Sequence, residues 1–311
     1  MKPIRTVQYN ILCSALAQPN VYPKNNPKDL EAESRVDKIW DKISAHIEQD
    51  AIICLQEISE TWISKFHTRF NQVGYTIFYS LYGDLYNDSM GVAIAYPTRR
   101  FESINSEIIN IGKSLPPKPR KSPNWLWLLI VGWLCWLSFD FKKWYQKKTF
   151  DPYIYAQGKR NRLLCAALTD KQTHQNFVIS TYHMPCAYRY PKVMDLHSSQ
   201  AITKVLDYAQ NYPVIFAGDF NICPSTHPYS NLINCLSSAY KEFNGQEPNH
   251  TCRTYTTLSH TLFSDCLDYI LYKGFRVLKV SSLPQNDNTL YPNKDEPSDH
   301  LLLWTDLEIE I

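Results

Sequence analysis

The sequence predicts a mixed α/β protein, with strands assembled into sheets that helices cover. Two observations support this class. Short apolar runs of strand length alternate along the chain with longer stretches whose apolar residues recur every three or four positions. The 311 residues, 44% hydrophobic and 20% charged, have the composition of an ordinary globular chain. With no repeat period, one domain over residues 1–311 is expected.

The first half of the chain begins with a strand and then a helix. A helix is expected at 29–49, where Val36, Ile39 and Ile43 fall on one face. A second helix is expected at 61–72, where Trp62, Phe66 and Phe70 share a face. The strands expected in this half are 4–12, 51–55, 74–80 and 90–97, the last two as a pair.

The second half continues the alternation and ends in strands. The apolar segments 162–169 and 176–183 flank a polar turn and are expected to form a hairpin. A helix is expected at 193–210. The remaining expected strands are 213–218, 266–274, 275–283 and 300–309.

Residues 113–150 interrupt this pattern as a basic, hydrophobic insertion. Eight basic residues and one acid lie between Lys113 and Lys148, so this stretch carries +7 and the rest of the chain −5 of the total +2. A proline-rich connector precedes Trp125–Phe139, which has no charge and contains half of the eight tryptophans. As a helix this segment would be about 22 Å long, too short for a bilayer core of about 30 Å.

We therefore interpret Trp125–Phe139 as a monotopic anchor that dips into one leaflet of an anionic membrane. Tryptophan favours the headgroup boundary, and the flanking lysines would each gain about 1 kcal/mol near an anionic surface. A buried core helix and a partner-binding helix are the alternatives.

The stretch "FAGDFNICPS" raises the question of chemistry, because an apolar strand leads directly into Asp219 and Asn221. In α/β sheets, ligands bind beyond the carboxyl ends of strands. A buried aspartate is costly unless it is paired or bound to metal, so we expect Asp219 to be exposed at the mouth of a site. The alternative is a simple capping turn.

Five other strand-associated segments also carry polar residues suited to catalysis. Each could be structural by itself, but their joint occurrence is hard to obtain from packing and predicts an active site. The residues are Asn10, Glu57, His183, Asp268, Asp299 and His300.

The ordered motifs "YNIL", "LQEI", "YH", "GDFN", "LDY" and "SDH" closely resemble the endonuclease/exonuclease/phosphatase superfamily of metal-dependent phosphoesterases. The resemblance covers nearly the whole chain except 115–150. The wording of "VQYNILCSALA", "DAIICLQEI" and "PSDHL" is most similar to the deadenylase and nocturnin branch. This resemblance implies two packed mixed β-sheets flanked by helices, a four-layer α/β sandwich.

The resemblance also implies roles at a metal site. Glu57 would be the principal ligand of Mg²⁺ (or Mn²⁺), a hard cation that prefers carboxylate oxygens. Asn10 would touch the metal or the phosphate, and Asp299 would complete the metal-side acids. Asp219 would position or deprotonate the attacking water, and Asn221 would hold the water or the phosphate.

The remaining implied roles concern the phosphate. His300 would contact the scissile phosphate or transfer a proton, with Asp268 orienting its imidazole, and His183 would donate to a non-bridging oxygen. Further candidates for substrate binding are Asn161, Arg162, Arg189 and Lys192. The histidines expected to be structural are His46, His67, His174, His197, His227, His250 and His260.

The implied activity is a 3′-to-5′ exonuclease of the deadenylase type that hydrolyses RNA or a nucleotide. One alternative is a membrane-associated phosphoesterase acting on a phosphoinositide or sphingomyelin, and another is a catalytically silent membrane scaffold. Nine cysteines without a CxxC pair predict reduced thiols in the cytoplasm. The N-terminal residues lack the apolar core of a signal peptide. Peripheral membrane association is expected, and no obligate protein partner.

Overall fold

The computed structural model describes residues 2–118, 150–257, 259–284 and 289–310. The predicted anchor Trp125–Phe139 lies outside the described residues, as does most of the 113–150 insertion. Among the described residues, no helix combines the length and the apolarity needed to cross a membrane.

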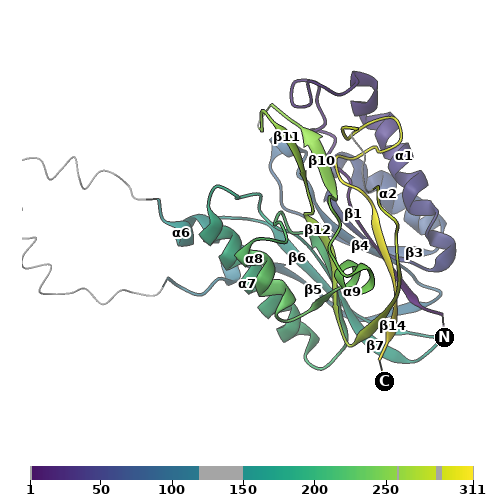
Figure 1. Cartoon of the computed structure of the whole chain (residues 1–311). Helices are drawn as coiled ribbons and strands as arrows, with labels where there is room; N and C mark the ends of the chain where they lie inside the picture. The colour runs from purple at the N-terminus through teal and green to yellow at the C-terminus, as the bar shows by residue number, and fades with distance from the viewer. Residues whose placement is uncertain (1, 119–149, 258, 285–288, 311) are drawn as a thin grey trace, which may run out of the picture.

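Two six-stranded mixed sheets form the centre of the molecule (Figure 1). The first sheet has the order β13-β14-β1-β2-β4-β3, in which β1 and β2 are parallel. Its strands are β1 (Ile4–Asn10), β2 (Ile52–Ile58), β3 (Tyr75–Leu81), β4 (Gly91–Pro97), β13 (Phe275–Val280) and β14 (Leu303–Ile309).

The second sheet has the order β5-β6-β7-β8-β12-β9, in which β7 and β8 are parallel. Its strands are β5 (Phe101–Asn110), β6 (Arg162–Asp170), β7 (Gln175–His183), β8 (Val214–Asp219), β9 (Ser237–Ser238) and β12 (Asp268–Lys273). A separate ribbon pairs β10 (Cys252–Tyr255) with β11 (Leu262–Asp265).

Helices cover the outer face of each sheet, and apolar side chains fill the space between the sheets. On one side lie α1 (Ala32–Ser44) and α2 (Glu60–Gln72), on the other α7 (Pro191–Ala209) and α8 (His227–Ile233) (Figure 1). Ile94, Leu164 and Ile215 belong to the core between the sheets. The predicted four-layer α/β sandwich is confirmed. The short helices are α3 (Ile111–Ser114), α6 (Pro152–Gln157), α9 (Ala239–Asn244), η1 (Pro27–Leu30), η2 (Ile47–Gln49) and η3 (Leu85–Asn87).

The apolar faces predicted from spacing are the buried faces of α1 and α2. Val36, Ile39 and Ile43 are at most 1% exposed on α1, and Trp62 and Phe66 are fully buried on α2. The α1 helix is shorter than the expected 29–49, because separate 3₁₀ turns, η1 and η2, occupy the two ends of that range.

Strand register brings the predicted polar residues together at one end of the sandwich. Asp219 on β8 lies opposite His183 on the parallel strand β7 and opposite Asp268 on the antiparallel strand β12. On the first sheet, Asn10 at the end of β1 pairs with Gln56 of β2. A glycine is required at 218, since a Cβ there would lie 2.1 Å from the carbonyl oxygen of Tyr182.

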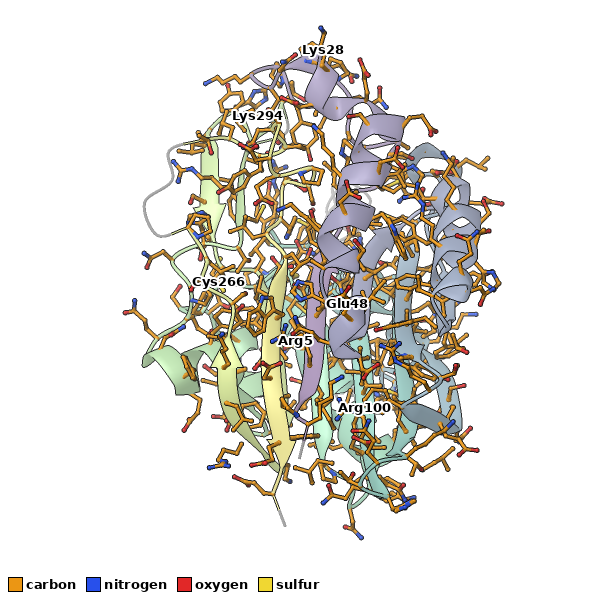
Figure 2. The ribbon with its side chains drawn as sticks, turned by 90° about the vertical axis from the view of Figure 1, so that its right-hand side faces the viewer. Arg5, Lys28, Glu48, Arg100, Cys266 and Lys294 are labelled. Atoms are coloured by element: carbon orange, nitrogen blue, oxygen red, sulfur yellow. The ribbon has the colours of Figure 1, made fainter. Side chains whose placement is uncertain are left out.

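At the opposite end of β1, a buried ion pair connects the two sheets. Arg100, which is fully buried, pairs with Asp170 at 2.8 Å and donates to the carbonyl oxygens of Lys2 and Pro3 (Figure 2). Arg5 on β1 pairs with Asp306 on β14 at 2.7 Å (Figure 2). The residues at the start of β1 are thus fixed to Arg100 and to β14, away from the polar cluster.

Candidate active site

Glu57 occupies a β-bulge at the end of β2. The register against β4 shifts between Gln56 and Ile58, and Glu57 has a φ of 60°, in the left-handed region. A bulge of this kind redirects a side chain that regular alternation would send elsewhere. One oxygen of its carboxylate (Oε1) accepts from Nδ2 of Asn10 at 3.0 Å, and the other (Oε2) accepts from the backbone N–H of Cys13 at 3.0 Å.

Asp219 is the corresponding carboxylate of the second sheet. Its Oδ2 accepts from Nδ2 of Asn10 at 2.9 Å, and its Oδ1 accepts from the backbone N–H of Asn221 at 2.9 Å. The amide of Asn10 therefore bridges Glu57 and Asp219, one carboxylate from each sheet.

The expectation that Asp219 is exposed is wrong, since only 1% of the residue is accessible. The reason is its place between β7 and β12, which the apolar run leading to it does not reveal. The donors from Asn10 and Asn221 offset the cost of burial. Burial raises the pKa of Asp219 to about 6, against the lowering effect of nearby His300.

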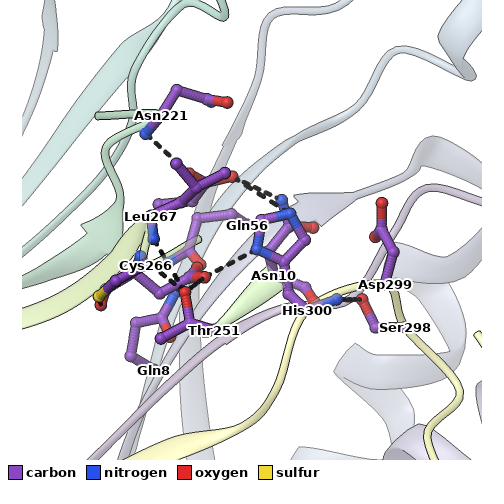
Figure 3. Close-up of polar contacts among 12 residues, drawn as sticks. Gln8, Asn10, Gln56, Asn221, Thr251, Cys266, Leu267, Ser298, Asp299 and His300 are labelled. Carbon is purple, nitrogen blue, oxygen red and sulfur yellow. Dashed lines mark hydrogen bonds and ion pairs between the residues drawn. The ribbon is translucent and has the colours of Figure 1, made fainter. Parts of the chain in front are cut away.

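His300 and Asp268 form a buried pair beside Asp219. Figure 3 shows His300 together with its chain neighbours Ser298 and Asp299. Nδ1 of His300 lies 2.8 Å from Oδ2 of Asp268, and Nε2 of His300 lies 3.8 Å from Oδ2 of Asp219. Gln8 and Thr251 donate to Asp268 at 2.8 and 2.6 Å, which fixes its orientation. Burial disfavours the imidazolium, but the carboxylate of Asp268 outweighs it, so the pKa of His300 is raised well above its ordinary value.

His183, at the end of β7, lies close to the carboxylates of Asp219 and Glu57. Its Nε2 lies 3.5 Å from Oδ2 of Asp219 and 3.9 Å from Oε1 of Glu57. The hydroxyl of Tyr82 lies 3.0 Å from its Nδ1. The imidazole is thus held on one side and directed toward the carboxylates on the other.

Asp299 lies on the far side of His300. Its Oδ2 accepts from the hydroxyl of Tyr22 at 2.9 Å, and burial raises its pKa. The ligand atoms of Cys252, Asp299 and His300 lie within 4.8 Å of one another. Asp299 therefore groups with His300, and the charge of Glu57 contributes to its raised pKa.

Two other groups have a composition that suits a divalent cation. The ligand atoms of Glu57, His183 and Asp219 lie within 4.8 Å of one another, as do those of Asp219, Asp268 and His300. Carboxylate oxygens dominate both groups, as a hard cation requires. The amide of Asn10 is neutral. The neighbouring negative charges of Glu57 and Asp219 therefore also need a positively charged partner. The residues present fit a divalent metal site.

The four predicted substrate-binding residues differ in position. Asn161 donates to the carbonyl oxygen of His183 at 2.8 Å, so it braces the end of β7 that carries this histidine. Arg162 is half-buried at the start of β6, and Arg189 is exposed. Lys192 pairs with Asp195 at 3.2 Å. No hydrogen bond or ion pair between described residues joins these three cations to Glu57 or Asp219.

Arg35 is a structural component of the site that the sequence analysis missed. Although it is only 1% exposed, it donates to the carbonyl oxygens of Ile11, Leu12 and Pro297 at 2.6 to 2.8 Å. It thereby ties the loop after β1 to the loop that carries His300. The sequence signal that could have identified Arg35 is its position four residues before Ile39, on the apolar face of α1. Other supporting residues not identified from sequence are Gln8, Tyr22, Tyr82 and Thr251.

Comparison with known proteins identifies the family. Residues 7–300 match the model of the Endonuclease/Exonuclease/phosphatase family. The chain belongs to this family. The family predicted from the motifs is thereby confirmed.

Relatives in this family include the 2′,5′-phosphodiesterase 12 of Homo sapiens, 24% identical over 335 residues that cover 98% of this chain and 51% of the relative. Nocturnin of Homo sapiens is 25% identical over 329 residues, covering 98% of this chain and 65% of the relative. This chain therefore spans about half to two thirds of the length of these relatives.

Solved structures of the family share the fold. The human Nocturnin catalytic domain with bound sulfate matches with a TM-score of 0.70 and 22% identity, covering 99% of this chain and 94% of that one. ANGEL2, described as a 2′,3′-cyclic phosphatase and bound to adenosine-2′,3′-vanadate, matches with a TM-score of 0.75 and 17% identity. That match covers 99% of this chain and 96% of the other.

Proposed function

We propose that this chain is a divalent-metal-dependent phosphodiesterase that hydrolyses RNA or a nucleotide, in the manner of a 3′-to-5′ exonuclease or deadenylase. The observation that carries the proposal is the bridge from Asn10 to Glu57 and Asp219, which assembles one carboxylate from each sheet. His183 and His300 lie 3.5 and 3.8 Å from the same oxygen of Asp219. The names of the relatives, 2′,5′-phosphodiesterase 12 and Nocturnin, support this substrate class.

The proposed cation, Mg²⁺ or Mn²⁺, would be held by Glu57 with Asn10 and Asp219 beside it. Asp299, on the other side of His300, is a further proposed ligand. When bound, such a cation neutralises charge on the phosphoryl oxygens and so favours attack on phosphorus.

The protein's own groups supply proton transfer and charge stabilisation. Asp219, whose pKa is raised by burial, is suited to accept the proton of the attacking water. The N–H of Asn221 holds the other oxygen of this carboxylate and so fixes its direction. Asp268 keeps Nε2 of His300 turned toward the reacting phosphate, where a protonated imidazole can donate to a non-bridging oxygen. His183 would donate from the opposite side.

Hydrolysis of a short oligoadenylate tests the proposal. We expect turnover with Mg²⁺, loss of turnover with a chelator, and recovery when Mg²⁺ is restored. The Glu57→Gln variant keeps an acceptor for Cys13 but loses the charge, so its kcat should fall by a factor on the order of 10² or more. Glu308→Gln, at an exposed pair with Arg276, is the matched control and should keep normal turnover. Near-normal rates in Glu57→Gln would exclude that residue from the proposed role.

Liposomes that carry phosphoinositides or sphingomyelin test the competing substrate class. Turnover confined to these lipids would contradict an RNA or nucleotide substrate. If neither lipid nor oligoadenylate is hydrolysed in the presence of metal, the chain would instead be a catalytically silent scaffold.

A further inference from the structure

Exposed aromatic rings gather outside the carboxylate cluster, where α6 meets the loop that follows β7. The rings of Phe150 and Tyr190 are stacked, with centroids 4.1 Å apart and planes 19° from parallel. Tyr155 lies 5.3 Å from each of them. Phe150, Tyr155 and Tyr190 are 47%, 38% and 38% exposed, and the nearby Tyr188 is 62% exposed. We call these four residues the aromatic shelf.

The backbone beneath the shelf is firmly held. Asp151 caps α6 by accepting from the N–H of Tyr153 at 2.9 Å. His197 of α7 lies 3.0 Å from the carbonyl oxygen of Ala156 in α6. Tyr190 directly precedes Pro191, the first residue of α7. The exposed rings therefore stand on ordered helix ends, which reduces the entropy that a ligand must overcome.

The shelf is directly connected to the candidate active site. The loop that carries Tyr188 and Tyr190 begins at His183, whose carbonyl oxygen accepts from Asn161 at 2.8 Å. Asn221 donates to the carbonyl oxygen of Met184, the next residue, at 2.9 Å. Tyr188 is five positions after His183, so their Cα atoms lie at most about 18 Å apart. A bound chain of a few nucleotides can span this distance.

Cations accompany the rings. Nζ of Lys159 lies 4.3 Å from the ring centre of Tyr155, and the guanidinium of Arg189 lies 5.7 Å from that of Tyr188. Arg189 is exposed and forms no ion pair with any acid among the described residues. Aromatic faces interleaved with cations are the chemistry by which proteins bind single-stranded nucleic acid.

We propose that the aromatic shelf stacks with unpaired bases of a single-stranded RNA substrate, while Lys159 and Arg189 contact its phosphates. The inference rests on the proposed function and refines it, because it makes the preferred substrate an oligonucleotide rather than a mononucleotide. Continuity with the loop after His183 favours RNA as the occupant over a membrane surface, since this loop joins the rings to the candidate active site.

The double variant Tyr188→Leu/Tyr190→Leu tests this inference, because leucine keeps apolar bulk but has no aromatic face. KM would be measured for a short oligoadenylate and for bis(p-nitrophenyl) phosphate, which is too small to reach the shelf. KM for the oligoadenylate should rise at least about fivefold more than KM for the small diester. Tyr212→Leu, which changes an exposed tyrosine away from the shelf, should leave both KM values unchanged.

Equal KM values for oligoadenylate in the double variant and the wild type would contradict the proposed role of the shelf in RNA binding, even if the wild type is an active phosphodiesterase. If the wild type hydrolyses no RNA, fluorescence anisotropy with labelled oligoadenylate decides the question separately. Weaker binding in the double variant would then support the shelf without the proposed function, and unaltered binding would refute it. Loss of sedimentation with phosphatidylcholine/phosphatidylserine vesicles at unchanged RNA affinity would identify a membrane contact instead and overturn the proposal.

Discussion

Glu57 shows a local conflict between stability and the geometry of the site. Its φ of 60° lies in a region that residues with a Cβ enter at a cost of roughly 1 kcal/mol. Hydrogen bonds from Asn10 and Cys13 hold its carboxylate and offset this cost. Strained residues persist where surrounding structure fixes them, and they cluster at functional sites. The bulge is thus the backbone signature of the candidate site.

Replacing Glu57 by glycine and by alanine should reverse the usual order of stability. In a regular strand glycine is less stable than alanine by about 0.5 to 1 kcal/mol, whereas here the positive φ favours glycine. We expect Glu57→Gly to have the higher free energy of unfolding, by about 1 kcal/mol, in urea titrations of both variants. Greater stability of Glu57→Ala would mean that the bulge relaxes and is not imposed by its surroundings.

At the level of single residues, the sequence revealed which side chains converge but not how they are held. Asn10, Glu57 and Asp219 could be identified because polar residues at the ends of apolar strands are unusual. The burial of Asp219 could not, since it depends on packing between two sheets. Tyr82 and Gln8 were not identified, because their partners His183 and Asp268 are distant in sequence. In addition, a tyrosine in an aromatic run cannot be distinguished from a core residue by sequence alone.

At the level of elements, apolar runs predicted the long buried strands and missed one exposed edge strand and three short ones. Strand β5 was not predicted because residues 102–108 are all exposed and mostly polar. It lies at the edge of its sheet and pairs with β6. Edge strands need little apolar surface and are often polar, which discourages pairing with other chains. The strands β9, β10 and β11 were missed because each has at most four residues.

His197 joins three elements and makes their packing sensitive to acid. The hydroxyl of Tyr182 on β7 donates to its Nδ1 at 2.8 Å, and its Nε2 donates to Ala156 of α6 at 3.0 Å. Burial lowers the pKa of His197 from 6.5 to about 4. The unfolded chain therefore takes up this proton at a higher pH than the folded chain does. The stability that neutral His197 contributes is complete above pH 6.5 and is lost as the pH falls toward 4.

We expect this group to account for about 2 kcal/mol of the stability lost between pH 7 and pH 5. His197→Gln, which offers an acceptor and a donor but no titrating ring, should lower the free energy of unfolding at pH 7 and reduce its fall toward pH 5. Urea titrations at the two pH values measure both effects. His67→Gln, at an exposed position, should keep the wild-type pH dependence. An unchanged slope in His197→Gln would show that other groups determine the acid sensitivity.

At the level of the whole molecule, the two sheets, their helices and the connecting loops supply the site residues among the described part of the chain. Lys118 and Asp151, which flank it, form an ion pair at 2.5 Å, so both ends of the segment meet at one place. The predicted anchor role of Trp125–Phe139 stays a prediction, since it concerns residues outside those described.

Replacement of residues 119–149 by a short glycine-serine linker tests that role. Because the ends already meet, we expect the thermal unfolding temperature to shift by no more than about 4 °C, with hydrolysis of bis(p-nitrophenyl) phosphate retained. Sedimentation with phosphatidylcholine/phosphatidylserine vesicles should be lost. Vesicle binding equal to wild type would exclude the anchor, and loss of hydrolysis would show that the segment contributes to the site.

The pairing of β1 with β14 has a consequence for biosynthesis. The carbonyl oxygen of Asn10 accepts from the hydroxyl of Ser298, 288 residues later, and β1 lacks its neighbour β14 until all of these residues have been made. A nascent chain that has not yet reached residue 298 therefore has Glu57 and Asp219 but neither His300 nor the strand that completes the first sheet. The candidate site can therefore be assembled only after residue 300 has been made.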